Sequence, residues 1–173
     1  TGCETPYDRL LLATGSEPWL PPIAGVTRPG VHVFRTLEDT AAMLAEGRRA
    51  RRAVVIGGGL LGLEAARGLA KRRVDVTLVH LMPWLMEQQL DAAAGALLRD
   101  AIQRLGVRVL LVRKTLGLEG AGGGERERVA RVAEGVRHLR VGRLVGVADE
   151  LVLERQLLVD AVKAAGEHRR ERQ

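Results

Sequence analysis

Three glycines spaced as Gly57-x-Gly59-x-x-Gly62 are the residues whose types and spacing most directly indicate a chemistry. They follow the apolar run at 53–56 and precede a run rich in alanine and leucine, where a buried strand would turn into a helix. Glycine permits a tight turn at the first position, a close approach to a diphosphate at the second, and close packing of helix on strand at the third. The helix N-terminus behind this turn would attract an anion, because its first N–H groups lack partners. The pattern predicts a dinucleotide-binding turn formed by Gly57, Gly58, Gly59, Leu60, Leu61 and Gly62; a glycine-rich turn that binds nothing is the alternative.

A second candidate ligand-binding residue is His80, which follows the apolar run at 74–79. Dinucleotide-binding folds usually offer an acidic side chain to the ribose 2′-hydroxyl from the end of this strand. A histidine can also bond a ribose hydroxyl, or face a 2′-phosphate when it is protonated. A polar strand end without a ligand is the alternative. Because neither a carboxylate nor an arginine stands at position 80, the sequence leaves the choice between NADH and NADPH open.

The elements that must position these residues form a repeating β–α pattern. Strands are predicted at 53–56, 74–79 and 107–112, with a helix after the glycine turn and a second one at 92–105. Asp91 is a suitable N-cap for the second helix and Gly106 a suitable end. Upstream, Thr36 followed by Asp39 predicts the start of a helix that reaches about Arg48. Successive β–α units of this kind indicate an α/β fold with a Rossmann-like, doubly wound parallel sheet.

Two shorter strands are expected nearer the N-terminus. Residues 9–14 form an apolar run that predicts a short buried strand, and residues 31–34 predict another. Between them, three prolines within residues 17–25 exclude a helix and favour an extended linker.

Composition narrows the function classes. The chain has 173 residues, of which 46% are hydrophobic and 28% charged, which is typical of a globular protein without a membrane span. Its net charge of +6 comes from scattered arginines with few aromatic residues between them, so nucleic-acid binding is not expected. A single cysteine, Cys3, excludes an internal disulfide and a cysteine-ligated metal site within this segment. The chain begins without methionine, so we expect a fragment of a larger, cytoplasmic protein.

A family resemblance becomes visible when the motifs are taken in order. Ala13-Thr14-Gly15-Ser16, then Pro22-Ile23-x-Gly25, then the glycine turn with Glu64 two residues beyond it, resemble the pyridine-nucleotide/FAD oxidoreductases. The resemblance implies that the glycine turn belongs to the NAD(P)H domain and that Ala13, Thr14 and Gly15 approach the flavin. It also implies that Glu64 lies near the nicotinamide end of the dinucleotide. The alternatives are a plain strand-to-loop turn at residues 13–15 and, for Glu64, an ordinary first-turn glutamate stabilised by the helix dipole.

A narrower resemblance covers residues 5 to about 118. The segments 34–39, 58–66 and 80–91 are similar to the large subunits of the NAD(P)H-dependent nitrite reductase family. This implies an electron-entry module in which NAD(P)H delivers hydride to FAD, with iron–sulfur and sirohaem centres only in missing parts of the parent protein. The expected partners are a nicotinamide dinucleotide and the rest of that reductase or its redox partner. A ferredoxin or rubredoxin reductase module and a non-catalytic nucleotide-binding remnant are the alternatives. No metal ligands and no acid–base catalytic residue stand out in this chain.

The C-terminal third departs from the family pattern. The resemblance implies a β-meander after the third strand and then a strand ending in Ala-x-Gly-x-Arg-Pro-Asn, and that motif is missing. The expected division is a partial FAD-domain segment and linker at 1–25, an NAD(P)H-binding domain at 26–118, and a divergent arginine-rich tail at 119–173. A frameshift near Gly120 would explain the tail, and a genuine divergent tail is the alternative.

Overall fold

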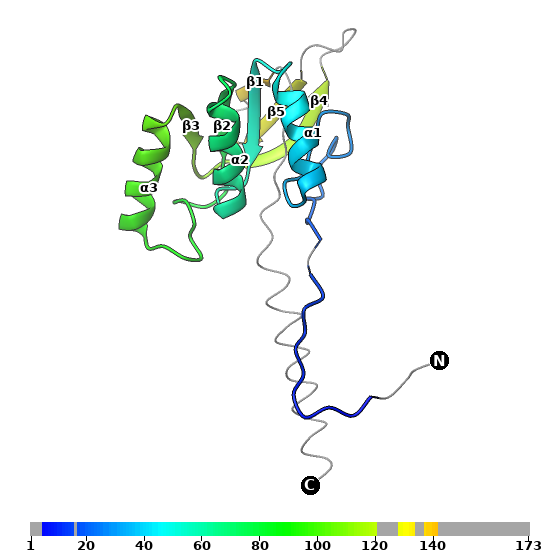
Figure 1. Cartoon of the computed structure of the whole chain (residues 1–173). Helices are drawn as coiled ribbons and strands as arrows, with labels where there is room; N and C mark the ends of the chain where they lie inside the picture. Colours follow the sequence, from blue (N-terminus) through cyan, green and yellow to red (C-terminus); the bar gives the residue numbers. More distant parts are fainter. Residues whose placement is uncertain (1–4, 16, 121–127, 134–136, 142–173) are drawn as a thin grey trace.

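The computed structural model describes residues 5–15, 17–120, 128–133 and 137–141 (Figure 1). The elements are the three helices α1 (Leu37–Gly47), α2 (Leu60–Ala70) and α3 (Ala92–Arg104) and the six strands β1 (Arg52–Ile56), β2 (Asp75–Val79), β3 (Val107–Leu110), β4 (Lys114–Gly120), β5 (Arg128–Ala133) and β6 (Arg137–Val141). The strands form two three-stranded sheets, one from β1 to β3 and one from β4 to β6.

The first sheet is parallel, which confirms the predicted fold class. Its strand order is β1-β2-β3, with α2 connecting the first pair and α3 the second. Ala53 pairs with Val76, and Val76 pairs in turn with Val107. Parallel strands joined by helices must end at one common edge of the sheet. The glycine turn after β1 and His80 after β2 therefore lie at the same carboxyl edge.

The main core lies between this sheet and its helices. Val55, Val76 and Leu78 of the sheet are fully buried, and so are Ala66 and Leu69 of α2. Burying such side chains stabilises the domain by about 1.5–3 kcal/mol for each large one. The buried face of α2 fixes the helix against β1 and β2, and with it the position of the glycine turn at its N-terminus.

Local capping contacts confirm two predicted helix starts. Thr36 and Asp39 form a capping box on α1, in which the Asp39 N–H donates to Thr36 Oγ1 at 3.1 Å and the Thr36 N–H to Asp39 Oδ2 at 2.9 Å. Asp91 caps α3 by accepting the Ala94 N–H at 2.8 Å. Gly106, whose φ of +88° suits glycine, follows the end of α3 as predicted.

Three strand predictions were wrong in whole or part. Residues 9–14 form no strand and are exposed, with Leu11 87% accessible, because no described strand lies beside them to complete a ladder. Residues 31–34 are half-buried but also form no strand. The third strand of the parallel sheet ends at Leu110, because Val112 has a φ of +53°, which a ladder cannot continue.

The second sheet is antiparallel and occupies the place where the resemblance implied a β-meander. Strand β4 pairs with β5, and β5 with β6. Leu118 of β4 is buried and its N–H donates to the Ala24 carbonyl at 2.7 Å, which ties the linker to this sheet. The expected domain boundary after residue 118 falls inside β4. Most of the expected tail, residues 142–173, lies outside the described residues.

Candidate functional site

The glycine turn joins β1 to α2 at the carboxyl edge of the parallel sheet. Gly57 has a φ of +107°, which favours glycine, and its N–H donates to the Val79 carbonyl at 3.0 Å, so the turn is anchored to β2. Gly59 is the N-cap of α2, and no side chain caps this helix. The first N–H groups of α2 therefore have no side-chain acceptor and can meet an anion.

Gly62 allows α2 to approach the turn closely. A Cβ atom at this position would overlap the Gly57 carbonyl oxygen and would lie 3.0 Å from the carbonyl carbon. The obstacle is backbone, and Gly57 cannot retreat freely because it is bonded to β2. Glycine at position 62 is therefore a packing requirement of this turn, as the motif predicted.

Gly58 is held through both of its backbone groups. Its N–H donates to Nδ1 of His80 at 3.0 Å, and its carbonyl accepts the Met86 N–H at 3.0 Å. A Cβ atom at position 58 would lie 2.6 Å from His80 Cγ and 2.8 Å from Leu85 Cδ2. The loop after β2 thus packs directly on the glycine turn and braces it. While these bonds stand, the Gly58 N–H is not directed at a ligand.

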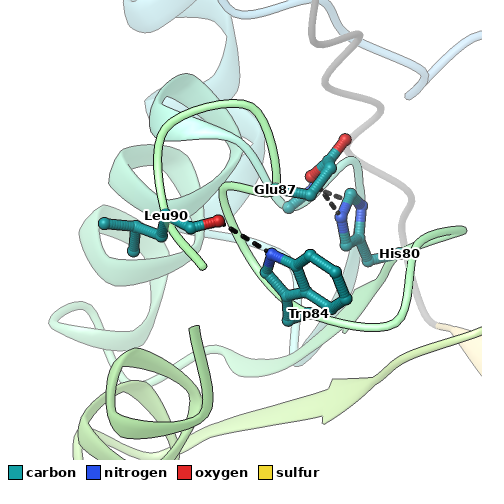
Figure 2. A network of polar contacts seen from close by, with 5 residues as sticks. His80, Trp84, Glu87 and Leu90 are labelled. Carbon is teal, nitrogen blue, oxygen red and sulfur yellow. Dashed lines mark hydrogen bonds and ion pairs between the residues drawn. The ribbon is translucent and has the colours of Figure 1, made fainter. Parts of the chain in front are cut away.

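His80 is 7% exposed and bonds the protein through both ring nitrogens (Figure 2). The Gly58 N–H can only donate, so Nδ1 is the acceptor and the proton of the neutral ring is on Nε2. Nε2 then donates to Oε2 of Glu87 at 2.9 Å. Sequence reasoning missed Glu87, because nothing in the spacing of residues 80 and 87 indicates that a loop brings them together.

A cavity of about 370 Å³ opens beside the turn. Ile56, Gly57, Val79 and His80 line it at the sheet edge, and residues 19–23 of the linker form another part of its wall. This volume lies within the range of small-molecule sites, and mostly apolar walls beside a few polar groups are typical of them.

The other predicted site residues are exposed or half-buried. Leu60 is exposed and Leu61 packs partly against the core, both in the first turn of α2. Glu64 is exposed on the same helix. Ala13, Thr14 and Gly15 are exposed in a segment that runs away from the sheets (Figure 1), so the structure does not bring them to the glycine turn.

Two further observations concern other kinds of site within the described part of the chain. No three histidine, cysteine, aspartate or glutamate side chains there gather in a way that could hold a metal ion. None of the helices described is both long and apolar enough to cross a membrane.

Comparison with protein families gives one extended match. The sequence profile described as "Pyridine nucleotide-disulphide oxidoreductase" matches residues 1–148. The chain is 51% identical over 115 residues to a nitrite reductase (NAD(P)H) of Bacillus subtilis, covering 66% of this chain and 14% of that protein. It is 43% identical over 129 residues to the large subunit of nitrite reductase (NADH) of Escherichia coli, covering 75% of this chain and 15% of that subunit. The chain therefore spans only a small part of these relatives.

Solved structures share the fold. A water-forming NADH oxidase from Lactobacillus brevis, bound to NADH, superposes with a TM-score of 0.71 at 22% identity and covers 83% of this chain and 31% of that one. A NAD-dependent persulfide reductase from A. fulgidus gives the same TM-score at 25% identity and covers 79% of this chain and 25% of that one.

Proposed function

This chain belongs to the pyridine nucleotide-disulphide oxidoreductase family, and from that premise we propose that it is the NAD(P)H-binding part of an FAD-dependent oxidoreductase. The observation that carries the proposal is the uncapped N-terminus of α2 behind Gly57, Gly59 and Gly62. This end of the helix stands at the carboxyl edge of a parallel sheet, where ligands of such sheets bind. Because position 62 is glycine, the N-terminus of α2 can lie close to the turn, where a Cβ would overlap the Gly57 carbonyl oxygen. A diphosphate fits there because the first N–H groups of the helix have no side-chain cap.

The residues of the turn have separate tasks in this proposal. The N–H groups of Gly59, Leu60 and Leu61 hold the diphosphate, since the Gly58 N–H already bonds His80. The dipole of α2 stabilises the bound anion by about 0.3–1 kcal/mol. The apolar cavity beside Ile56 and Val79 takes one end of the dinucleotide and keeps water from it. Glu64 is proposed to lie towards the nicotinamide end.

A bound nicotinamide would supply hydride to FAD, and the protein's own task is to orient the two rings. Ala13, Thr14 and Gly15 are proposed as the flavin-side contacts. They are exposed in this structure and therefore accessible to a flavin. The 51% and 43% identity to nitrite reductases supports an electron-entry module of that type, whose partners would be the rest of the reductase in the cytoplasm. Iron–sulfur and sirohaem centres would lie in parts that this chain does not encode.

The division into segments 1–25, 26–118 and 119–173 is part of the same proposal. Strand β4 crosses the second boundary; the arginine-rich residues at 128–133 pair with it as β5, and those at 137–141 pair with β5 as β6. The ladder that begins before residue 118 thus continues beyond it, so a change of reading frame near Gly120 has to be tested on the DNA.

Calorimetric titration of the purified chain with NADH and NADPH tests the proposal. We expect saturable binding of one dinucleotide per chain. ADP-ribose should compete, because it carries the diphosphate, and nicotinamide riboside should not, because it lacks the diphosphate. A folded chain that binds neither dinucleotide would contradict the proposed function.

A further inference from the structure

The strand-end position that usually recognises ribose is occupied by a side chain with no free nitrogen. His80 accepts the Gly58 N–H at Nδ1 and meets Glu87 through Nε2, at 3.0 and 2.9 Å. An imidazole has only these two polar atoms. A ribose hydroxyl could bond His80 only if one of the two contacts broke. At this end of β2, the carboxylate of Glu87 still has bonding capacity.

Glu87 is placed by the loop that covers the glycine turn (Figure 2). The adjacent Met86 N–H donates to the Gly58 carbonyl, and the Leu85 side chain is fully buried. The indole N–H of Trp84 donates to the Leu90 carbonyl at 2.9 Å and closes the loop on itself. The position of Glu87 is thus fixed by backbone contacts to the same turn that would hold the diphosphate.

The carboxylate of Glu87 is held at one oxygen only. Oε2 accepts the His80 Nε2–H, while Oε1 has no hydrogen-bond partner among the described residues. The side chain is 22% exposed, so a ligand at the carboxyl edge can reach it. Arg113, which lines the same cavity as His80, directs Nη1 to the carbonyls of Leu111 and Val112. Beside the glycine turn, the carboxylate of Glu87 therefore keeps one oxygen available to a ligand.

We propose that Glu87, oriented by His80, recognises the ribose 2′-hydroxyl of the dinucleotide and makes this chain prefer NADH to NADPH. The inference rests on the proposed function, since it assigns the selectivity of that same site. A carboxylate accepts a hydrogen bond from the 2′-hydroxyl, and charge-assisted bonds of this kind are the stronger ones. A 2′-phosphate at the same place would bring two like charges together. His80 acts as a positioning residue, which keeps Glu87 at the edge and braces the turn.

The test compares Glu87→Gln with the wild-type chain in titrations with NADH and with NADPH. Glutamine keeps the size of the side chain and an oxygen that can accept the His80 Nε2–H, so the loop should stay folded. We expect NADH to bind about tenfold more weakly and NADPH at least about threefold more tightly than to the wild type. Glu38→Gln, which removes the same charge from an exposed position on α1, should change neither dissociation constant.

The outcomes separate this inference from the proposed function. If the wild type binds NADH well and Glu87→Gln leaves the ratio of the two dissociation constants unchanged, the assignment of Glu87 is wrong and the dinucleotide site stands. A wild type that prefers NADPH would overturn the inference in the same way. If the folded wild type binds neither nucleotide, both proposals fail together. Equal weakening of NADH and NADPH by Glu87→Gln would show a purely structural role and would also overturn the inference.

Discussion

Replacing Gly95 by alanine should show how tightly the loop after β2 is packed. Gly95 is buried near the start of α3, and a Cβ atom there would lie 2.7–2.9 Å from Cδ1, Cβ and Cγ of Trp84. Ordinary contacts of this type begin at 3.4 Å, so Trp84 or α3 must move by several tenths of an ångström. Trp84 cannot simply swing away, because one of the three atoms is its own Cβ and its indole N–H is bonded to Leu90.

Gly68→Ala is the matched control for this change. Gly68 lies inside α2, and a Cβ atom there would meet nothing within 4 Å. Both substitutions replace glycine by alanine in a helix, which by itself stabilises the fold by about 1 kcal/mol. The difference between the two variants therefore isolates the overlap with Trp84. Overpacking of a filled site costs about 1–3 kcal/mol, so we expect Gly95→Ala to be less stable than Gly68→Ala by that amount.

Urea unfolding followed by far-ultraviolet circular dichroism measures both free energies of unfolding. Tryptophan fluorescence gives a second readout, since a displaced Trp84 changes its surroundings while Trp19 is already 44% exposed. The reasoning is refuted if Gly95→Ala is as stable as Gly68→Ala, because the packing of Trp84 on α3 would then not constrain the loop.

Three further results are expected. Gly62→Val should abolish binding of both dinucleotides, because its Cβ would overlap the Gly57 carbonyl. Far-ultraviolet circular dichroism should still show a folded chain. Unchanged dissociation constants would contradict the assignment of the diphosphate to this turn. The purified chain should be colourless, since residues 13–15 are exposed, and flavin absorbance at one FAD per chain would contradict this. A change of reading frame near Gly120 predicts that another frame of the encoding DNA restores the strand ending in Ala-x-Gly-x-Arg-Pro-Asn; an intact frame without that motif would identify a genuine tail.

The elements that depend on neighbours in sequence were predictable. Thr36 and Asp39 form their capping box within four residues, and Asp91 caps α3 just as locally. The glycine spacing likewise predicts the local turn, because the strand, the turn and the helix are contiguous in the sequence. The parallel sheet followed from the repeated order of strand and helix, so its carboxyl edge could be located without any structure.

The contacts that cross the chain were not predictable. Residues 9–14 have the composition of a buried strand, yet burial needs a partner strand, and composition carries no information about the partner. The bond between Gly58 and His80 joins residues 22 apart, and the contact with Glu87 depends on a loop without periodicity. The sequence identified the position of His80 and left open a ribose contact or a polar strand end; the structure gives both of its nitrogens protein partners.

The two hydrogen bonds at Gly58 couple the shape of the glycine turn to the loop after β2. That loop carries His80 and Glu87, to which nucleotide preference is assigned. A side chain at position 58 and the ring at position 80 compete for the same space, since a Cβ at 58 would lie 2.6 Å from His80 Cγ. A larger residue at position 58 therefore requires a change at position 80 as well. Swapping only the strand-end residue to convert nucleotide preference would release the Gly58 N–H and loosen the diphosphate site. Positions 58 and 80 therefore have to be redesigned together.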